Sequence, residues 1–229
     1  MLLRGLIATD LSGSLAGITA SRNKGGAYFR ERISPVNPNT TFQAAIRAAM
    51  SNLTAIWRDE LTGAQRTAWT TYAENTPVTN RIGDTIFLSG LSHYVRSNVP
   101  RVQAGLARVD AAPTLFGLAE MGTVEVIGAD ETTNVIAFSF QNTAAWAGAA
   151  GGALLVYVSR PQGPATNFFK GPYRYAGRVN GAGTPPTSPG SVTAPFDLSA
   201  DQRVFVRFRA TEAGGRLSTD FRDFAVVTG

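Results

Sequence analysis

Residues 203–210 read RVFVRFRA, and this stretch decides the structural class of the second half of the chain. Two sets of side chains alternate along it: Val204, Val206 and Phe208, and between them Phe205, Arg207 and Arg209. Successive side chains of a strand point to opposite faces, so the first set shares one face and the second set shares the other. The stretch therefore predicts a strand whose apolar face lies in a core.

Six further runs rich in β-branched and aromatic residues accompany this strand. The seven expected strands are 123–127, 134–140, 153–159, 173–179, 192–196, 203–210 and 220–227. Turn-forming residues separate them, with GAGTPPTSPGS at 181–191 as an exposed loop and EAGGR at 212–216 as the last hairpin turn. Seven short strands with such turns predict a β-sandwich over residues 112–229.

Residues 39–110 carry helical signals instead. Thr40 with Gln43 and Thr62 with Gln65 have the spacing of two capping boxes, each of which opens a helix. An amphipathic stripe follows the first box, and a third helix is expected over 89–98, ended by Pro100. The segment predicts a small helical docking region.

Residues 1–38 predict an extended arm or β-hairpin. An alternating run at 13–21 leads into an Asn-Lys-Gly-Gly turn at 23–26 and then into an aromatic run at 27–30. The alternation puts Ile18 and Ala20 on one face. Pro35 and Pro38 end any regular element. The whole chain is thus expected to be an α+β multidomain protein with three segments, 1–38, 39–110 and 112–229.

Composition and charge bound the function. The 229 residues include no cysteine and one histidine, charged residues are 16%, and the net charge is +5. The excess positive charge lies in the first half, where 12 basic residues meet 7 acidic ones up to Asp110. The opening segment is broken by Arg4 and Asp10, which argues against a signal peptide, and no apolar run approaches the roughly 20 residues of a membrane span.

Residues that could carry catalysis are sparse. His93 would have to serve any Ser-His-Asp triad, and a zinc site needs several His or Cys ligands. The carboxylate pairs Asp59-Glu60 and Asp130-Glu131 are adjacent in sequence, which favours solvated surface over a glycosidase pair. We expect a non-enzymatic protein with no catalytic residue, no metal and no cofactor.

The arm is the first candidate contact surface. Its basic and aromatic residues are Arg22, Lys24, Tyr28, Phe29, Arg30 and Arg32. Such interleaving can hold phosphates and stack bases, so a nucleic-acid-binding arm is one hypothesis. Binding to an acidic protein surface would need the same residues, so a protein-docking arm is the other hypothesis.

Three aromatic residues of the helical region, Trp57, Trp69 and Tyr72, are the second candidate. Their spacing indicates a core between two helices. If the small region cannot bury them, they become anchors for a partner or a second copy, because Trp and Tyr are favoured at interface hot spots.

Three stretches of the first 110 residues form a recognisable pattern: SLAGITASRNKGGAYFRERISPVNPNT, WRDELTGAQRTAWTTYA and FLSGLSHYVRSN. Its defining residues are Arg30, Arg32, Pro35, Asn37, Pro38, Thr40, Trp57, Leu61, Thr62, Gln65, Arg66, Trp69, Gly90, Tyr94 and Asn98. In this pattern the chain resembles a family of uncharacterised structural proteins of tailed phages and prophages. The second half resembles a fibronectin type III or immunoglobulin-like module.

These resemblances imply a virion protein made in the bacterial host cytoplasm. The leading expectation is a decoration or cement protein that binds the major capsid protein or other virion proteins, as a homo-oligomer and without a membrane. The alternatives are a tail or connector component, a nucleic-acid-binding protein, and a carbohydrate-binding module or glycosidase built on the β half.

Overall fold

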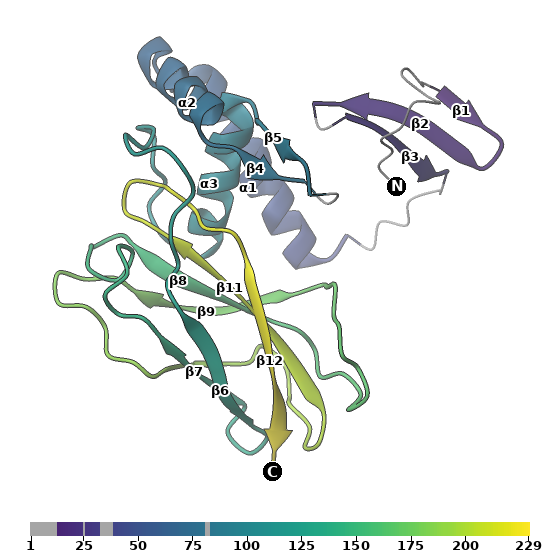
Figure 1. Ribbon diagram of the computed structural model, residues 1–229, viewed down its shortest axis with the longest axis vertical. Helices are drawn as coiled ribbons and strands as arrows, with labels where there is room; N and C mark the ends of the chain where they lie inside the picture. The colour runs from purple at the N-terminus through teal and green to yellow at the C-terminus, as the bar shows by residue number, and fades with distance from the viewer. Residues whose placement is uncertain (1–12, 25, 33–38, 81–82) are drawn as a thin grey trace. The chain divides into compact units, whose positions relative to one another are not determined.

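The chain is an α+β protein of two compact units (Figure 1). The computed structural model describes residues 13–24, 26–32, 39–80 and 83–229. One unit spans residues 1–93 and the other spans 94–229. The division falls inside the helix at 90–103 and not at the expected boundary near residue 111.

The second unit contains a seven-stranded sheet with the order β10-β7-β6-β12-β11-β8-β9. Its strands are β6 (Val124–Asp130), β7 (Val135–Phe140), β8 (Ala153–Val158), β9 (Arg174–Asn180), β10 (Gly190–Thr193), β11 (Arg203–Thr211) and β12 (Phe221–Thr228). All pairs are antiparallel except β6 with β12, which is parallel. Each of the seven expected strands is confirmed within a few residues.

The alternation of β11 divides two apolar clusters, as its sequence predicts. Val204, Val206 and Phe208 are fully buried in the larger cluster, together with residues of β6, β7 and β8. Phe205 faces the other way and belongs to a second cluster with Tyr157 and Tyr173. The sheet therefore buries side chains on both faces around β11.

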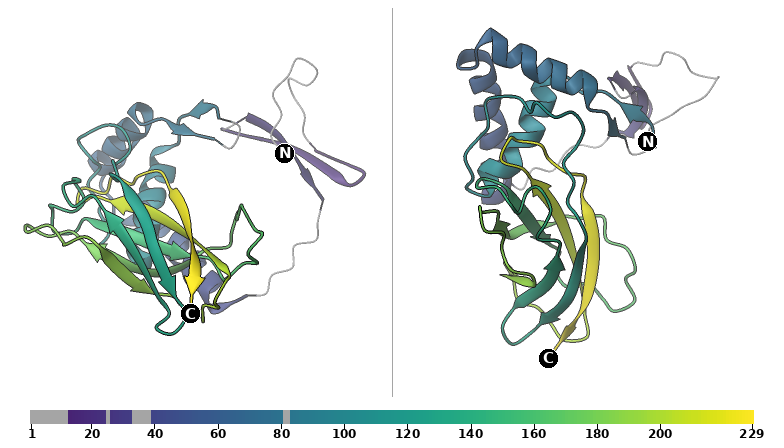
Figure 2. Two further views of the ribbon diagram at one scale, coloured as in Figure 1. Left: turned by 60° about the horizontal axis from the view of Figure 1, so that its bottom comes forward. Right: turned by 60° about the vertical axis from the view of Figure 1, so that its left-hand side comes forward.

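The sheet curls until its two end strands lie close together (Figure 2). Gly177 on β9 and Gly190 on β10 permit this approach. A Cβ at Gly177 would lie 3.0 Å from Val192 Cγ1, and one at Gly190 would lie 3.4 Å from Val179 Cγ2. The result is a nearly closed barrel with the larger cluster inside.

Helix α3 (Gly90–Gln103) runs through Pro100, so the prediction that Pro100 ends it is wrong. The carbonyl of Pro100 still accepts a hydrogen bond from Ala104 N at 3.0 Å. Arg101 then fixes this turn, because its guanidinium reaches the carbonyls of Ala107, Gly151 and Glu212. These bonds explain why most of α3 belongs to the second unit.

Helices α1 (Thr41–Asp59) and α2 (Gly63–Asn75) begin at the two expected capping boxes. The hydroxyls of Thr40 and Thr62 accept hydrogen bonds from the backbone of Gln43 and Gln65, at 3.3 and 3.2 Å. Arg66 closes the corner by donating to the carbonyl of Arg58 at 3.0 Å. The local pattern alone was sufficient to predict both helix starts.

The N-terminal sheet has three strands, β1 (Gly13–Leu15), β2 (Ile18–Asn23) and β3 (Gly26–Glu31). The expected β2–β3 hairpin is confirmed, but a turn at residues 16–17 splits the first run into two strands. Ala20 is buried whereas Ile18 is 52% exposed. The rest of the expected arm, residues 1–12 and 33–38 with Pro35 and Pro38, lies outside the described residues.

A two-stranded ribbon, β4 (Val78–Thr79) with β5 (Thr85–Ile86), precedes α3. No helix within the described ranges has the length and apolar content that crossing a membrane requires.

Candidate functional site

The candidate residues of the arm divide between the two faces of the N-terminal sheet. Ser21 pairs with Tyr28 and Ala20 pairs with Phe29, so Tyr28 and Arg30 share one face while Phe29 and Arg22 share the other. Tyr28 and Phe29 are half-buried, whereas the four basic residues, Arg22, Lys24, Arg30 and Arg32, are exposed. The six residues therefore make two basic-aromatic surfaces and not one.

The aromatic residues of the helices do not form a surface. Trp69 and Tyr72 are 0% and 1% exposed, and their rings meet edge to face at 5.8 Å. Tyr72 packs in the same way on the buried His93, at 5.3 Å. Trp57 is half-buried. Burial makes Trp69 and Tyr72 core residues, so the partner-anchor hypothesis does not apply to these two rings.

Most of the motif residues in the helices have structural contacts. A Cβ on Gly90 would lie 2.7 Å from Thr70 Oγ1 and 2.9 Å from Thr70 N, so this glycine lets α3 approach α2. Tyr94 donates to Asp110 at 3.2 Å, and Asn98 both donates to and accepts from the backbone of Val109. These motif residues thus hold the helices and the loop after α3 in place, whereas Arg30 and Arg32 of the arm are exposed.

A second candidate surface, which the sequence did not reveal, covers the outer face of β8, β11 and β12. Arg203, Phe205 and Arg207 on β11 pair with Val226, Phe224 and Arg222 on β12. Arg207 lies over the rings of Tyr157 and Tyr173, at 4.5 and 5.2 Å. Arg203 lies over Phe224 at 5.1 Å. We call this set of residues the Arg-aromatic face.

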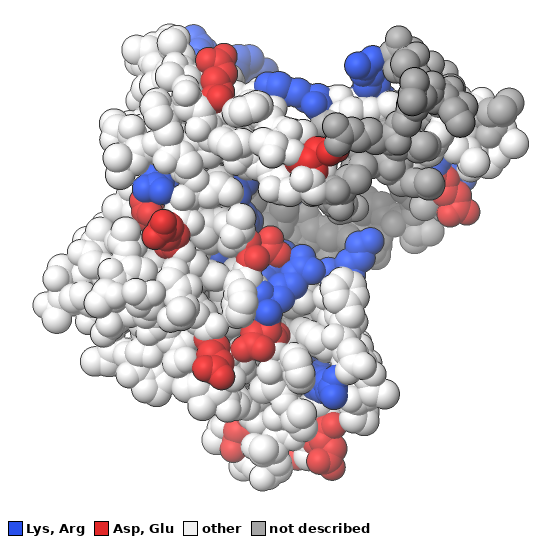
Figure 3. Space-filling view, in the orientation of Figure 1, with Lys and Arg blue, Asp and Glu red and all other residues white. Residues whose placement is uncertain are grey.

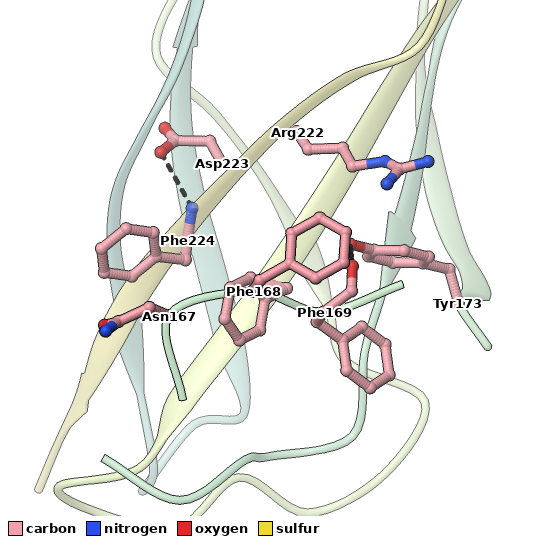
Figure 4. A pocket seen from close by; sticks show the side chains of 8 residues that line it. Asn167, Phe168, Phe169, Tyr173, Arg222, Asp223 and Phe224 are labelled. Atoms are coloured by element: carbon pink, nitrogen blue, oxygen red, sulfur yellow. Dashed lines mark hydrogen bonds between the residues drawn. The ribbon is translucent and has the colours of Figure 1, made fainter. Parts of the chain in front are cut away.

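A pocket of about 180 Å³ opens on this face (Figure 4). The loop before β9 supplies Asn167, Phe168 and Phe169 to its lining, and β12 supplies Arg222 and Phe224. Phe168 is 71% exposed and Phe224 is 44% exposed. A second hollow of about 140 Å³ shares Phe169. The pocket is smaller than the roughly 300 Å³ at which sites for drug-sized ligands begin.

Positive charge is concentrated beside the pocket. Burial, and then the charge of Arg96, lowers the pKa of Arg209 to about 10. Burial alone would raise the pKa of Asp220, but the hydrogen bond from Arg222 and the charges of Arg222, Arg209 and Arg207 outweigh it and lower that pKa. Elsewhere on the surface seen in Figure 3, basic and acidic side chains also lie side by side. Beside the pocket, the charges of Arg207, Arg209 and Arg222 all act on the one carboxylate of Asp220.

Two guanidinium nitrogens of this face are buried without a partner. Within residues 13–24, 26–32, 39–80 and 83–229, neither Arg207 Nε nor Arg209 Nε has a hydrogen-bond acceptor. A buried N–H that makes no hydrogen bond is unfavourable, and most such groups in folded proteins are satisfied. The strand β11 therefore keeps two buried N–H groups unsatisfied beneath this face, within the described residues.

The groups considered for catalysis have ordinary local roles. His93 Nε2 lies 3.3 Å from the carbonyl of Thr76. Asp59 pairs with Arg58 at 2.8 Å, and Asp130 accepts from Thr133 N at 2.7 Å in a turn. Over the described part of the chain, no three His, Cys, Asp or Glu side chains gather as metal ligands would.

Comparisons with protein-family models, with curated proteins and with solved structures found no match, so residue chemistry and geometry carry the functional argument.

Proposed function

We propose that this chain is a structural protein of a tailed-phage virion, a decoration or cement protein that docks on the head lattice through its N-terminal sheet. A tail or connector component is the same proposal at another position in the virion. The resemblance of the first 110 residues supports a location in the virion. The N-terminal sheet is the part proposed to bind the lattice.

One observation carries the docking role: few of the described side chains in the N-terminal sheet are buried. Among its described side chains, Ala20 alone is buried. Small sheets need a hydrophobic face or a packed neighbour to be stable in water. Exposed arginines on both faces suit ion pairs with acidic subunits, because the guanidinium fork binds carboxylates in two places. A lattice partner would complete this sheet.

The second unit is proposed to be an immunoglobulin-like or fibronectin type III-like module. Its strand order supports this, because β7 lies between β6 and β10 while β11 lies between β12 and β8. With the strands lettered in order, these neighbours correspond to A-B-E and G-F-C, which an immunoglobulin domain also has. The fourth strand, β9, departs from that pattern because it pairs with β8 and not with β10. Such a module would project from the lattice or contact a neighbouring copy.

Purified virions provide the test. Mass spectrometry should find the chain in a fixed ratio to the major capsid protein, and a variant lacking residues 13–32 should be lost from the particles. Arg30→Gln with Arg32→Gln should weaken attachment without changing the thermal unfolding of the second unit. Virions that contain no trace of the chain would overturn the proposal.

Nucleic-acid binding is the second candidate, because Tyr28 and Arg30 share a face of the sheet. Binding through phosphates weakens steeply as salt rises. A gel shift with single-stranded DNA that disappears between low and moderate salt would favour this candidate. No shift at low salt would remove it.

A further inference from the structure

The Arg-aromatic face has a feature that folding alone does not explain. Arg207 and Arg222 lie directly opposite each other on paired strands. Like charges in that position destabilise a sheet. Asp220 pairs with Arg222 at 3.0 Å, whereas Arg207 has no carboxylate partner in the described chain. Arg207, which has no ion-pair partner in the described chain, therefore lies directly beside Arg222, which has one.

The guanidinium of Arg207 is also held in place. The rings of Tyr157 and Tyr173 hold it at 4.5 and 5.2 Å, and Tyr173 is itself fixed by donating to the carbonyl of Phe169 at 3.0 Å. Its Nε is buried and lacks an acceptor within the described residues. The side chain as a whole is only half-buried, so a partner would meet its outer N–H groups and not Nε. A planar group held by two rings is organised in advance for an acceptor with two oxygens.

Apolar surface lies next to these donors. The pocket of about 180 Å³ is lined by Phe168, Phe169, Phe205 and Phe224, with Arg222 at its edge (Figure 4). Exposed aromatic residues beside arginine are the composition of interface hot spots. The volume suits one inserted side chain.

We propose that the Arg-aromatic face binds a segment of a protein partner in which an Asp or Glu adjoins an apolar side chain. The carboxylate binds at Arg207 and Arg222, and the apolar side chain enters the pocket. This site lies on the second unit and is independent of the proposed docking role of the N-terminal sheet.

Charge complementarity favours this partner over a nucleic acid. Asp220 lies at this face, paired with Arg222 at 3.0 Å, and its carboxylate would repel a phosphodiester chain. A neutral glycan would leave the charge of Arg207 uncompensated. An acidic protein segment compensates it, and its apolar neighbour covers the phenylalanines.

The test is an array of short peptides in a Gly-Ser frame, with every pair of amino acids at the centre, probed with the full chain. We expect selection of pairs that combine Asp or Glu with an apolar residue. For a selected peptide, replacing the acid by its amide should weaken binding at least about tenfold, the effect of one lost charge-assisted contact. Titration calorimetry gives the affinities.

Variants separate this site from general electrostatics. Arg207→Gln should weaken peptide binding about tenfold while thermal unfolding stays unchanged or improves. Lys170→Gln removes the same charge from an exposed neighbour of Phe169 and should change affinity less than twofold. The proposal is overturned if no acidic pair is selected, if the amide peptides bind equally well, or if only a sulfated oligosaccharide or single-stranded DNA binds.

Discussion

Two arginines of the second unit, one buried and one half-buried, lie in opposite surroundings. Arg101, which is 2% exposed, makes four hydrogen bonds, to the carbonyls of Ala107, Gly151 and Glu212 and to the hydroxyl of Thr211. Arg207 stacks between two tyrosines and leaves its buried Nε without an acceptor in the described chain. Arginine thus stabilises the fold at position 101, whereas at position 207 its guanidinium is proposed to bind a partner.

The difference is informative because buried charge is unfavourable unless it is satisfied. Arg101 joins α3 to the loop at 105–110 and to two turns of the sheet, so its own burial is compensated within the chain. Arg207 is compensated mainly by its two rings. Natural proteins often keep such locally unfavourable groups at functional sites.

The largest expected effect is at Arg101. Arg101→Met should lower the free energy of unfolding by about 3–4 kcal/mol, because three carbonyls and one hydroxyl lose a buried charged donor. Urea denaturation of the full chain measures this value. The matched control, Arg160→Met at an exposed position, should stay within about 0.5 kcal/mol. Equal effects at the two positions would remove the structural role of Arg101.

Asn98 is the next test of the same region. Its amide donates to the carbonyls of Tyr94 and Val109 and accepts from Val109 N at 2.7 Å. Asn98→Ala should lower the free energy of unfolding by about 2 kcal/mol, since buried partners are left unsatisfied. The exposed Asn180→Ala is the control and should have little effect. A neutral Asn98→Ala would show that the loop at 105–110 is held by other contacts.

Arg207 should behave in the opposite way. Arg207→Met keeps an unbranched side chain in contact with the ring of Tyr157 and removes the positive charge that repels Arg222. Replacing buried charge by apolar volume is often neutral or stabilising, so we expect a change between zero and a gain of about 1 kcal/mol. The same urea denaturation measures it. A loss as large as that at Arg101 would make Arg207 a structural residue as well.

The smallest effect concerns pH and Asp220. The pKa of this carboxyl is lowered in the folded chain, so its contribution to stability is present above the unfolded pKa near 3.9 and is lost as the pH falls through the folded value. Because the pair is partly exposed, the contribution should stay below about 1 kcal/mol. Asp220→Asn should flatten the stability profile between about pH 5 and pH 2. An unchanged profile would exclude this pair as its source.

Local signals in the sequence predicted much of the fold. Alternation located the strand at 203–210, and the Thr40 and Thr62 boxes located two helix starts, because these features depend on residues within one turn or one strand. The continuation of α3 past Pro100 was missed, since it depends on Arg101 reaching residues about 50 and 110 positions away.

The Arg-aromatic face was missed for a related reason. The sequence showed that Arg207 and Arg209 share the face opposite the core. It did not show that Tyr157 and Tyr173 pack over that face, or that residues 167–169 form a pocket there, because these contacts come from separate segments. Conversely, Trp69 and Tyr72 looked like possible anchors until their burial was known.

Arginine side-chain NMR of the full chain tests the contrast between Arg101 and Arg207 most directly. The Nε–H signals of both residues are recorded while a selected acidic-apolar peptide is added. The Arg207 signal should shift and saturate, because the peptide carboxylate binds the outer N–H groups of the same guanidinium, while the Arg101 signal should stay in place. An Arg207 signal that does not move, or an Arg101 signal that moves equally, would contradict the assignment of one arginine to the fold and the other to a partner.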